Sequence, residues 1–216
     1  MGWRQYRKIK PNEFIVVGYD MAMGGPDYSC AVFLSKTNLD VPLIFHERCI
    51  ATEATNEIVP VLERISDVAG VSPIIAPETN AGGVYEIERI NALNRLNKFK
   101  MYKSKPVGSI DGGEATRYGF TTNTATRPKM LEDLKNAIDH RLIGIYDKPL
   151  INEMFSFIIS NSSTSWKARA EQNGHDDLVM ALAIAWQLYQ SEEPHKLKAD
   201  YKDFPDDTRV FNKGFY

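Results

Sequence analysis

The chain has 216 residues, of which 43% are hydrophobic and 25% charged, which is enough for one globular domain with a substantial core. Its net charge of -2 excludes a basic surface over the whole molecule, so nucleic-acid binding would depend on local patches or metal ions. The N-terminus lacks the apolar core of a signal peptide, and no apolar stretch is long enough to span a bilayer, which argues against a membrane protein.

The first part of the chain is predicted to form three strands joined by turns. Cys30 and Cys49 both lie in these apolar runs, and we expect two reduced, buried thiols rather than a disulfide, which fits a cytoplasmic setting. The turn-rich segment 21–27 joins the first two strands. The predicted strands are 14–19, 28–34 and 43–50.

Helices and short strands alternate after residue 52. Apolar positions recur with helical spacing from Ile58 to Val68, and Gly70 ends this helix. A short strand, 74–78, precedes a second helix with apolar positions from 84 to 93, and 100–103 is a further short strand. This alternation predicts an α/β fold.

The last part of the chain is predicted to be helical. Thr126 caps one helix, and 150–159 is a second, apolar one. A polar loop, 161–174, leads to the last strongly periodic helix, 177–189. The tail after this helix is polar and charged, and we expect it to fray.

Acidic residues stand at the ends of several predicted elements. Asp20 ends the first strand, Glu78 ends a later strand, and the pair Asp176 and Asp177 opens the last helix. Strand ends meet at one edge of an α/β sheet, and a helix packed across the sheet can bring its first residues to the same place. Gathered carboxylates would repel one another unless they held divalent cations, and oxygen ligands favour Mg²⁺ or Mn²⁺ over Zn²⁺. Two such ions, about 3.5 to 4 Å apart, promote phosphodiester hydrolysis, so the acids predict a nuclease.

Each of these acids also has a purely structural interpretation. Asp20 precedes a Gly-Gly-Pro turn, Glu78 suits a surface position after a strand, and Asp176 suits the N-cap of the helix that Asp177 enters. His175 would either contact the metal site or a phosphate, or serve a structural role beside the cap. The conjunction of the acids favours the metal cluster over the separate interpretations.

Longer segments of the chain resemble the nuclease domain of the large terminase subunit of tailed bacteriophages. The resemblance covers most of residues 14–190 and implies an RNase H-like fold with a central mixed sheet flanked by helices. The segments that carry it are Val16–Ala31, Pro77–Gly83, Tyr118–Asn123 leading to Thr126-Arg127-Pro128, and Gly174–Asp177 with the alanine-rich helix that follows.

The resemblance implies that the domain cuts concatemeric viral double-stranded DNA during genome packaging, in the cytoplasm of the bacterial host and transiently at the procapsid portal. Carried over by motif, the catalytic metal ligands are Asp20, Glu78 and Asp177, with Asp176 second for the last role. Asp20 would bridge two Mg²⁺ or Mn²⁺ ions, with the other acids completing their shells. The implied partners are the ATPase motor, the small terminase subunit and the portal protein.

The resemblance implies an ATPase motor domain before the nuclease domain, and we expect it to be absent from these residues, because the sequence contains no Gly-x-x-x-x-Gly-Lys-Ser/Thr loop. We expect residues 1–12 to be a linker remnant, 13–190 the nuclease domain and 191–216 a C-terminal tail. Such a chain would not translocate DNA by itself.

Basic residues near the predicted loops are candidate contacts to DNA phosphates. Phosphate contacts carry no direct sequence information, so we expect little sequence specificity. Lys167 and Arg169 are the preferred pair, because their loop leads directly to the acids. The full set of candidates is Lys103, Lys105, Arg117, Arg127, Lys129, Lys167 and Arg169.

Two other classes of function remain open. An ATP-binding domain of the actin and sugar-kinase type also ends its first strand in Asp, but it needs a second glycine-rich segment, and after Gly144 only Gly174 and Gly214 remain. A non-catalytic module would use the acids to bind a structural cation while its surface docks the packaging motor. Plasmid nicking with Mn²⁺, ATP hydrolysis without DNA and the variant Asp20→Asn distinguish the three classes.

Overall fold

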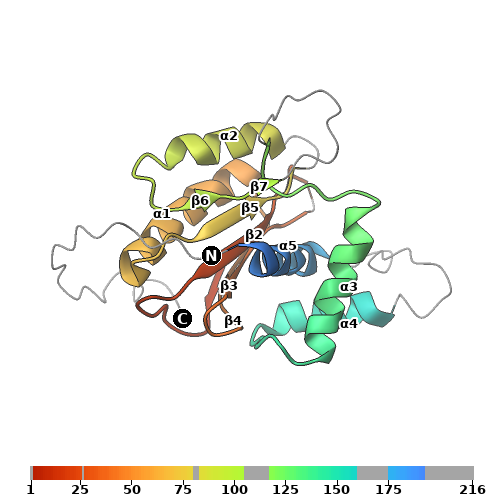
Figure 1. Cartoon of the computed structure of the whole chain (residues 1–216). Helices are drawn as coiled ribbons and strands as arrows, with labels where there is room; N and C mark the ends of the chain where they lie inside the picture. Colours follow the sequence, from red (N-terminus) through yellow and green to blue (C-terminus); the bar gives the residue numbers. More distant parts are fainter. Residues whose placement is uncertain (1, 26, 80–82, 105–116, 160–174, 193–216) are drawn as a thin grey trace, which may run out of the picture.

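A computed structural model describes residues 2–25, 27–79, 83–104, 117–159 and 175–192. Its centre is a six-stranded sheet in the order β1-β4-β3-β2-β5-β6, with helices on both faces (Figure 1). The sheet is mixed, because β2 pairs antiparallel with β3 and parallel with β5. This architecture confirms the predicted α/β fold, with a central mixed sheet flanked by helices.

The observed elements follow the predicted order closely. Helix α1 ends just before Gly70, as predicted. Both cysteines are free, but only Cys30 is buried, because Cys49 is partly exposed. The strands are β1 (Trp3–Gln5), β2 (Ile15–Asp20), β3 (Ser29–Ser35), β4 (Asp40–Glu47), β5 (Ile74–Pro77), β6 (Lys100–Met101), β7 (Lys103–Ser104) and β8 (Arg117–Tyr118). The helices are α1 (Ala51–Ala69), α2 (Gly83–Leu93), α3 (Thr126–Asp139), α4 (Lys148–Ile159) and α5 (Asp177–Ser191).

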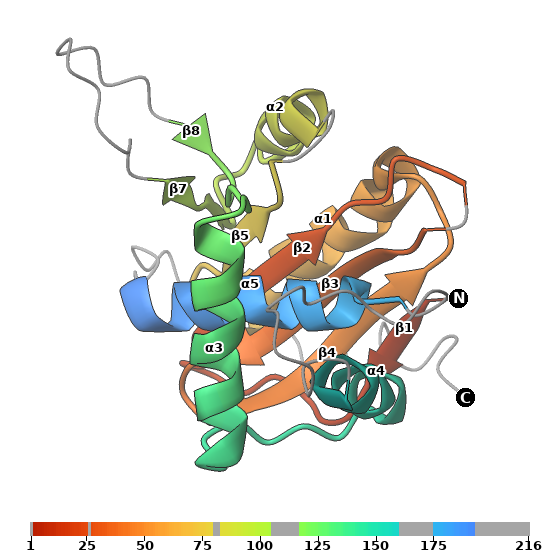
Figure 2. The ribbon, with the colours of Figure 1, turned by 90° about the vertical axis from the view of Figure 1, so that its right-hand side faces the viewer.

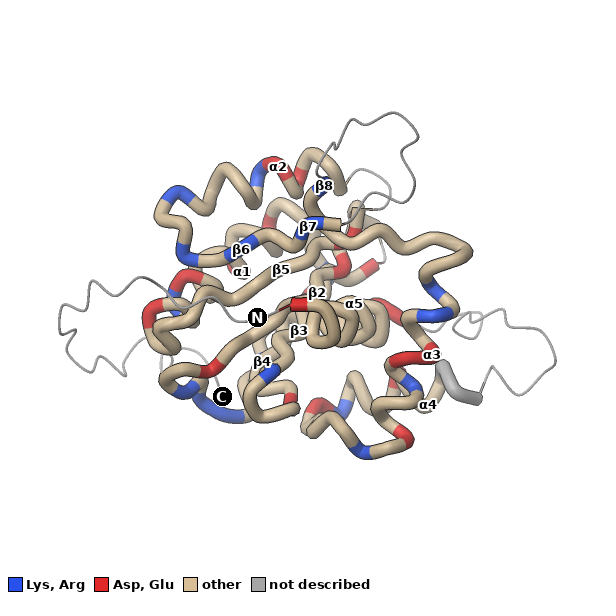
Figure 3. Tube along the Cα trace, in the orientation of Figure 1, with Lys and Arg blue, Asp and Glu red and all other residues tan. Residues whose placement is uncertain are grey.

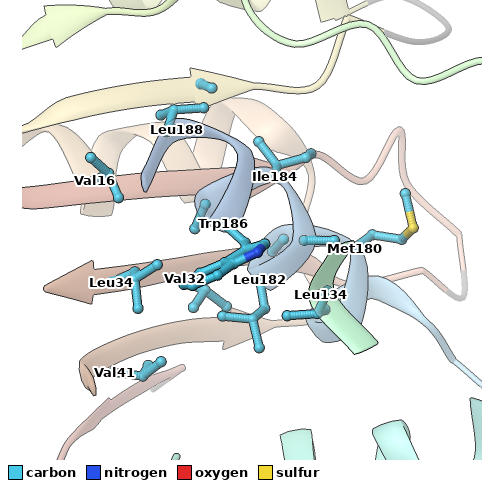
Figure 4. Close-up of a cluster of buried hydrophobic side chains, with 14 of the residues drawn as sticks. Val16, Val32, Leu34, Val41, Leu134, Met180, Leu182, Ile184, Trp186 and Leu188 are labelled. Atoms are coloured by element: carbon cyan, nitrogen blue, oxygen red, sulfur yellow. The ribbon is translucent and has the colours of Figure 1, made fainter. Parts of the chain in front are cut away.

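Each face of the sheet has its own apolar core, because successive side chains of a strand point to opposite faces. On one face, Val17 and Tyr19 of β2 lie in a cluster with residues of α1 and α2. On the other face, Val16 and Val32 pack against α5, around side chains such as Leu182 (Figure 4). Helices α3 and α4 lie on this second face with α5, and α3 crosses α5 (Figure 2).

Gly18 allows α5 to lie directly on β2. A Cβ atom at this position would come within 2.0 Å of the carbonyl oxygen of Ala181 and 2.6 Å of the backbone nitrogen of Ala185. Gly18 precedes Asp20 by two residues, and Ala181 follows Asp177 by about one helical turn. This backbone contact therefore sets the start of α5 close to the end of β2.

The N-terminal segment differs from its linker interpretation. Residues 3–5 form β1, which pairs antiparallel with β4 at the edge of the sheet. The Trp3 ring packs edge-on against Phe45, with ring centroids 5.0 Å apart. Arg7 donates hydrogen bonds to Glu13 and Asp40 at 2.5 Å each. The segment is thus attached to the sheet by strand pairing, ring packing and ion pairs.

Two local predictions are corrected. The predicted strand 100–103 is divided, because β6 pairs with β5 whereas β7 pairs with β8 in a separate ladder. Thr126 begins α3 but does not cap it. Instead, Asn123 Oδ1 accepts hydrogen bonds from the backbone nitrogens of Ala125 and Thr126, both at 2.9 Å, and Thr126 Oγ1 accepts one from the Asn123 nitrogen. This reciprocal arrangement is a capping box that begins at Asn123.

The predicted polar loop 161–174 and the tail beyond residue 192 lie outside the described residues. Among the helices of the described ranges, none has the length and apolar character needed to cross a membrane.

Candidate metal centre

Asp20 and Glu78 meet at the carboxyl ends of two parallel strands. Asp20 is the last residue of β2, and Glu78 follows β5, with its backbone nitrogen donating to the Tyr19 oxygen at 2.8 Å. In the register of these strands Gly18 lies opposite Ala76, so the next positions on the same face are Asp20 and Glu78. Both acids therefore lie on the face that α5 covers, and a hydrogen bond joins their carboxyl groups.

The two acids at the start of α5 have different surroundings. Asp177 is the first residue of α5 and its side chain is 17% exposed. Its Oδ2 atom is buried, makes no hydrogen bond within the described ranges, and lies 3.5 Å from His175 Nδ1. Asp176 occupies the N-cap position, but its side chain makes no capping bond and forms an ion pair with Arg127 of α3 instead. The Asp176 side chain therefore does not cap α5, in contrast to the structural interpretation considered for it.

The acids disfavour one another's ionisation. Burial, together with the nearby charges of Glu78, Asp177 and Asp176, raises the pKa of Asp20 well above its usual range. Burial also raises the pKa of Glu78, although Asp20 and Arg127 act in the opposite direction. Burial and then Asp176 raise the pKa of Asp177 to about 6. A bound cation would favour the ionised forms and reverse these shifts.

The carboxylates do not form a closed ligand set. Over the described residues, no three His, Cys, Asp or Glu side chains are already arranged to hold one metal ion. Their contacts explain why: Asp176 faces Arg127, and Asp20 is hydrogen-bonded to Glu78. The donor set nevertheless fits a hard divalent cation, because it consists of carboxylate oxygens and includes the buried Oδ2 of Asp177 that lacks a hydrogen-bond donor among the described residues.

Comparison with known proteins places this geometry in a known fold. No protein-family model matches the chain, and no curated protein matches it in sequence. Solved structures do match: the large terminase nuclease from thermophilic phage G20c with bound cobalt has a TM-score of 0.62 at 16% identity, over 87% of each chain. The chain has the fold of large terminase nuclease domains.

Two further solved structures support the same conclusion. The large terminase nuclease domain of Thermus phage P74-26 has a TM-score of 0.61 at 15% identity, over 91% of this chain and 90% of that one. The Mn-soaked terminase nuclease domain of human cytomegalovirus has a TM-score of 0.52 at 12% identity, over 81% of this chain and 83% of that one. The resemblance seen in the sequence is thus confirmed at the level of the terminase nuclease fold.

Within this terminase nuclease fold, Thr122 is a site residue that sequence reasoning missed. Its hydroxyl donates a hydrogen bond to Glu78 Oε1. The preceding segment runs beside the end of β5, with the Phe120 nitrogen donating to the Pro77 oxygen at 2.8 Å. Gly119 permits this approach, because its φ is +91° and a Cβ atom would lie 2.6 Å from the same oxygen. Thr122 lies in the segment 118–123 that carried the resemblance, which was the available signal.

Glu153 of α4 is the second residue that was missed. Its Oε2 atom accepts a hydrogen bond from the Val179 backbone nitrogen in the first turn of α5, at 3.2 Å. Burial and the charge of Asp177 raise the pKa of Glu153 to about 8. No sequence signal distinguished this glutamate from any other polar residue of the predicted helix 150–159.

His175 lies beside Asp177, with its Nδ1 atom 3.5 Å from Asp177 Oδ2. Apart from its proximity to Asp177, its ring meets the Tyr28 ring edge-on, with centroids 5.0 Å apart. Tyr28 also packs on His46, with centroids 4.5 Å apart. His175 thus belongs to a row of rings that leads away from the carboxylates.

The predicted phosphate contacts fall into three groups. Lys103 and Arg117 are exposed on β7 and β8, and Lys129 is exposed in the first turn of α3. Arg127 pairs with Asp176, so acidic and basic positions meet where α3 and α5 begin (Figure 3). Three other candidates lie outside the described residues: Lys105, Lys167 and Arg169.

Proposed function

We propose that this chain is a metal-dependent endonuclease that cleaves concatemeric viral double-stranded DNA during genome packaging, by two-metal-ion phosphodiester hydrolysis. One observation carries the proposal: Asp20, Glu78 and the pair Asp176 and Asp177, from three distant segments, interact at one edge of the sheet. The terminase nuclease fold supports it, and the G20c nuclease has also been solved with bound magnesium and with bound zinc.

Asp20, Glu78 and Asp177 would hold two Mg²⁺ or Mn²⁺ ions, and Asp176 would join them when it separates from Arg127. The raised pKa of Asp20 supports this assignment, since carboxylates that resist ionisation without a cation are suited to binding one. Bound divalent ions would stabilise the negative charge on the attacking and departing oxygens of the phosphodiester. The chain itself would supply the ligands and their orientation.

Exposed basic residues would bind the DNA backbone beside these acids. Lys103 and Arg117 occupy one ladder, and Lys129 lies on α3, close in sequence to Arg127. Because phosphates look the same in every sequence, such contacts would give cleavage with little sequence specificity. The ATPase motor of the full-length protein, the small terminase subunit and the portal protein would deliver the DNA to this site.

The test is cleavage of supercoiled plasmid by the purified chain, with Mn²⁺, with Mg²⁺ or with EDTA. We expect metal-dependent nicking, and a loss of about 100-fold or more in Asp20→Asn, at least as large as the losses from changes around the ligands of other metal sites. Asp67→Asn is the matched control, because Asp67 is an exposed acid of α1 on the other side of the sheet, paired with Lys98.

Each other outcome points to a different class of function. Undiminished cleavage by Asp20→Asn would contradict the catalytic assignment. ATP hydrolysis without DNA, in a protein that does not cut plasmid, would favour the kinase-type interpretation. Mn²⁺ binding without either activity would favour a non-catalytic module.

A further inference from the structure

The first turn of α5 obtains its cap from a different helix. The first backbone N–H groups of a helix lack partners inside it, and an Asp at the N-cap normally accepts hydrogen bonds from the second or third helical residue. In α5 the Asp176 side chain does not do so. Glu153 of α4 accepts a hydrogen bond there instead, from the Val179 nitrogen at 3.2 Å.

Capping by Glu153 matters because it leaves the carboxylates of Asp176 and Asp177 free of the capping role. A capping carboxylate folds back onto the helix end, and its oxygens are then occupied by N–H groups. With Glu153 in that role, Asp176 pairs with Arg127 and Asp177 retains a buried oxygen without a hydrogen-bond donor in the described part of the chain. The charges of both carboxylates still act on Asp20, whose pKa they help to raise.

We infer that Glu153 is a positioning residue that caps α5 from α4 and thereby leaves Asp176 and Asp177 available to the metal centre. This inference rests on the proposed function, because it takes the two aspartates as metal ligands. It assigns to Glu153 a role that acts through the start of α5, without contact to the substrate.

Helix α4 is itself held firmly, which makes it a suitable support. Asp147, which is fully buried, accepts a hydrogen bond from the Leu150 nitrogen at 2.7 Å at the start of α4. The same carboxylate accepts hydrogen bonds from Arg4 at 2.5 Å and from Tyr6 at 2.6 Å. These contacts fix α4 against β1 and the residues that follow it, and α4 lies next to α5 (Figure 2). A side chain on such an element places its partner more accurately than one on a loop.

Two variants of similar size separate capping from charge. Glu153→Gln keeps a carbonyl oxygen that can accept the hydrogen bond from the Val179 nitrogen, whereas Glu153→Met fills similar space and has no strong acceptor. Glu153→Ala, which adds no bulk, serves if the methionine variant does not fold. The matched control is Asp133→Ala, which removes the hydrogen bond from Gln187 Nε2 of α5 to Asp133 Oδ2 of α3, at 3.1 Å, towards the other end of the helix.

The experiment measures Mn²⁺ binding by calorimetry and exchange of the Val179 backbone amide by NMR, on the full chain. We expect Glu153→Met to weaken Mn²⁺ binding by about tenfold, as changes around metal ligands typically do, and to accelerate exchange of the Val179 amide. Glu153→Gln should resemble the wild type in both measurements. Asp133→Ala should leave Mn²⁺ affinity unchanged.

The outcomes that overturn the inference are distinct from those that overturn the proposed function. Equal losses in Glu153→Gln and Glu153→Met would show that charge, and not capping, is what Glu153 contributes. Wild-type Mn²⁺ affinity in Glu153→Met or Glu153→Ala would also overturn the positioning role. Wild-type Mn²⁺ affinity in Asp20→Asn would instead contradict the assignment of the metal centre. It would therefore also contradict the proposed function on which the inference rests.

Discussion

Two groups of acids in this chain differ in the cations that face them. In the N-terminal group, Arg7 donates hydrogen bonds to both Glu13 and Asp40. Although burial acts in the opposite direction, these contacts and others lower the pKa of Glu13 to about 2. At the metal centre, in contrast, burial and neighbouring acids raise the pKa of Asp20 and of Asp177.

The two groups differ in their pKa shifts because they differ in their arginine partners, since burial acts on the acids of both groups. Arg7 is bound by two carboxylates, whereas Arg127 contacts Asp176 and only reduces the shift of Glu78. An acid with an arginine partner stabilises the fold when it is ionised, and an acid without one destabilises it. The acids at the metal centre therefore reduce stability unless a cation binds, as expected of a functional site.

The largest effect should come from removing the cation of the N-terminal group. Arg7→Met leaves Glu13 and Asp40 buried without their main partner, so the free energy of unfolding should fall by about 3 kcal/mol, the lower end for a broken buried pair. Urea denaturation measures this change. Lys98→Met is the control, because its pair with Asp67 is partly exposed and should be worth less than about 1 kcal/mol.

Removing an ionisable acid from the metal centre should not lower the free energy of unfolding. Asp20→Asn replaces a carboxyl group that resists ionisation with a neutral amide, which can still donate to Glu78. Without metal, this variant should be at least as stable to urea as the wild type. A large loss of stability would mean that Asp20 supports the fold in the way that Glu13 does.

An intermediate effect is expected from pH. Asp177 has a pKa of about 6 in the folded protein and about 3.9 when unfolded, so between these values the folded state binds more protons. The contribution of Asp177 to stability should therefore rise as pH falls from 7 to 5 in EDTA, by ~1 kcal/mol, or about 3 °C in melting temperature for a domain of this size. His46 acts in the opposite direction, because burial lowers its pKa to about 4. Differential scanning calorimetry of the wild type and of Asp177→Asn measures the contribution of Asp177 as the difference between the two profiles.

The N-terminal group should reverse this trend at lower pH. The pKa of Glu13 is about 2 in the folded protein, below its unfolded value, so the stability that it contributes is lost as pH falls from about 4.5 towards 2. Glu13→Gln should flatten that part of the profile. A wild-type profile in both Asp177→Asn between pH 7 and 5 and Glu13→Gln below pH 4.5 would contradict the contrast between the two groups.

The smallest effect is expected at Arg127. Its ion pair with Asp176 is partly exposed, and such pairs are worth about 0.2 to 1 kcal/mol. Arg127→Gln should tighten Mn²⁺ binding by up to about fivefold, because Asp176 loses a competing cation. Calorimetry with Lys129→Gln as the control measures this difference. Weaker Mn²⁺ binding in Arg127→Gln would show that the arginine orients Asp176 for the metal.

Much of the fold could be predicted from the sequence, because several central elements are continuous apolar runs. The runs that became β2, β3 and α5 bury nearly every residue, so their apolar character was plain. β1 could not be predicted in this way, since three residues with a central arginine give no pattern. Its pairing depends on β4, which lies about forty residues further along the chain.

The acids of the candidate site could be predicted from the sequence, because they are carboxylates at the ends of predicted strands and at the start of a predicted helix. The register of β2 and β5 turned the strand-end positions of Asp20 and Glu78 into a contact. The pairing of Arg127 with Asp176 spans 49 residues, and the capping by Glu153 connects two separate helices. Such contacts depend on how helices pack, which local sequence does not encode.

The contact between Gly18 and α5 has a consequence for how this site tolerates change. Helix and strand touch through their backbones at this point, so the approach of α5 to β2 requires the absence of a side chain at position 18. A single methyl group there would push the helix away and widen the spacing between Asp20 and Asp177. A residue with no side chain thus controls the distance between two of the acids.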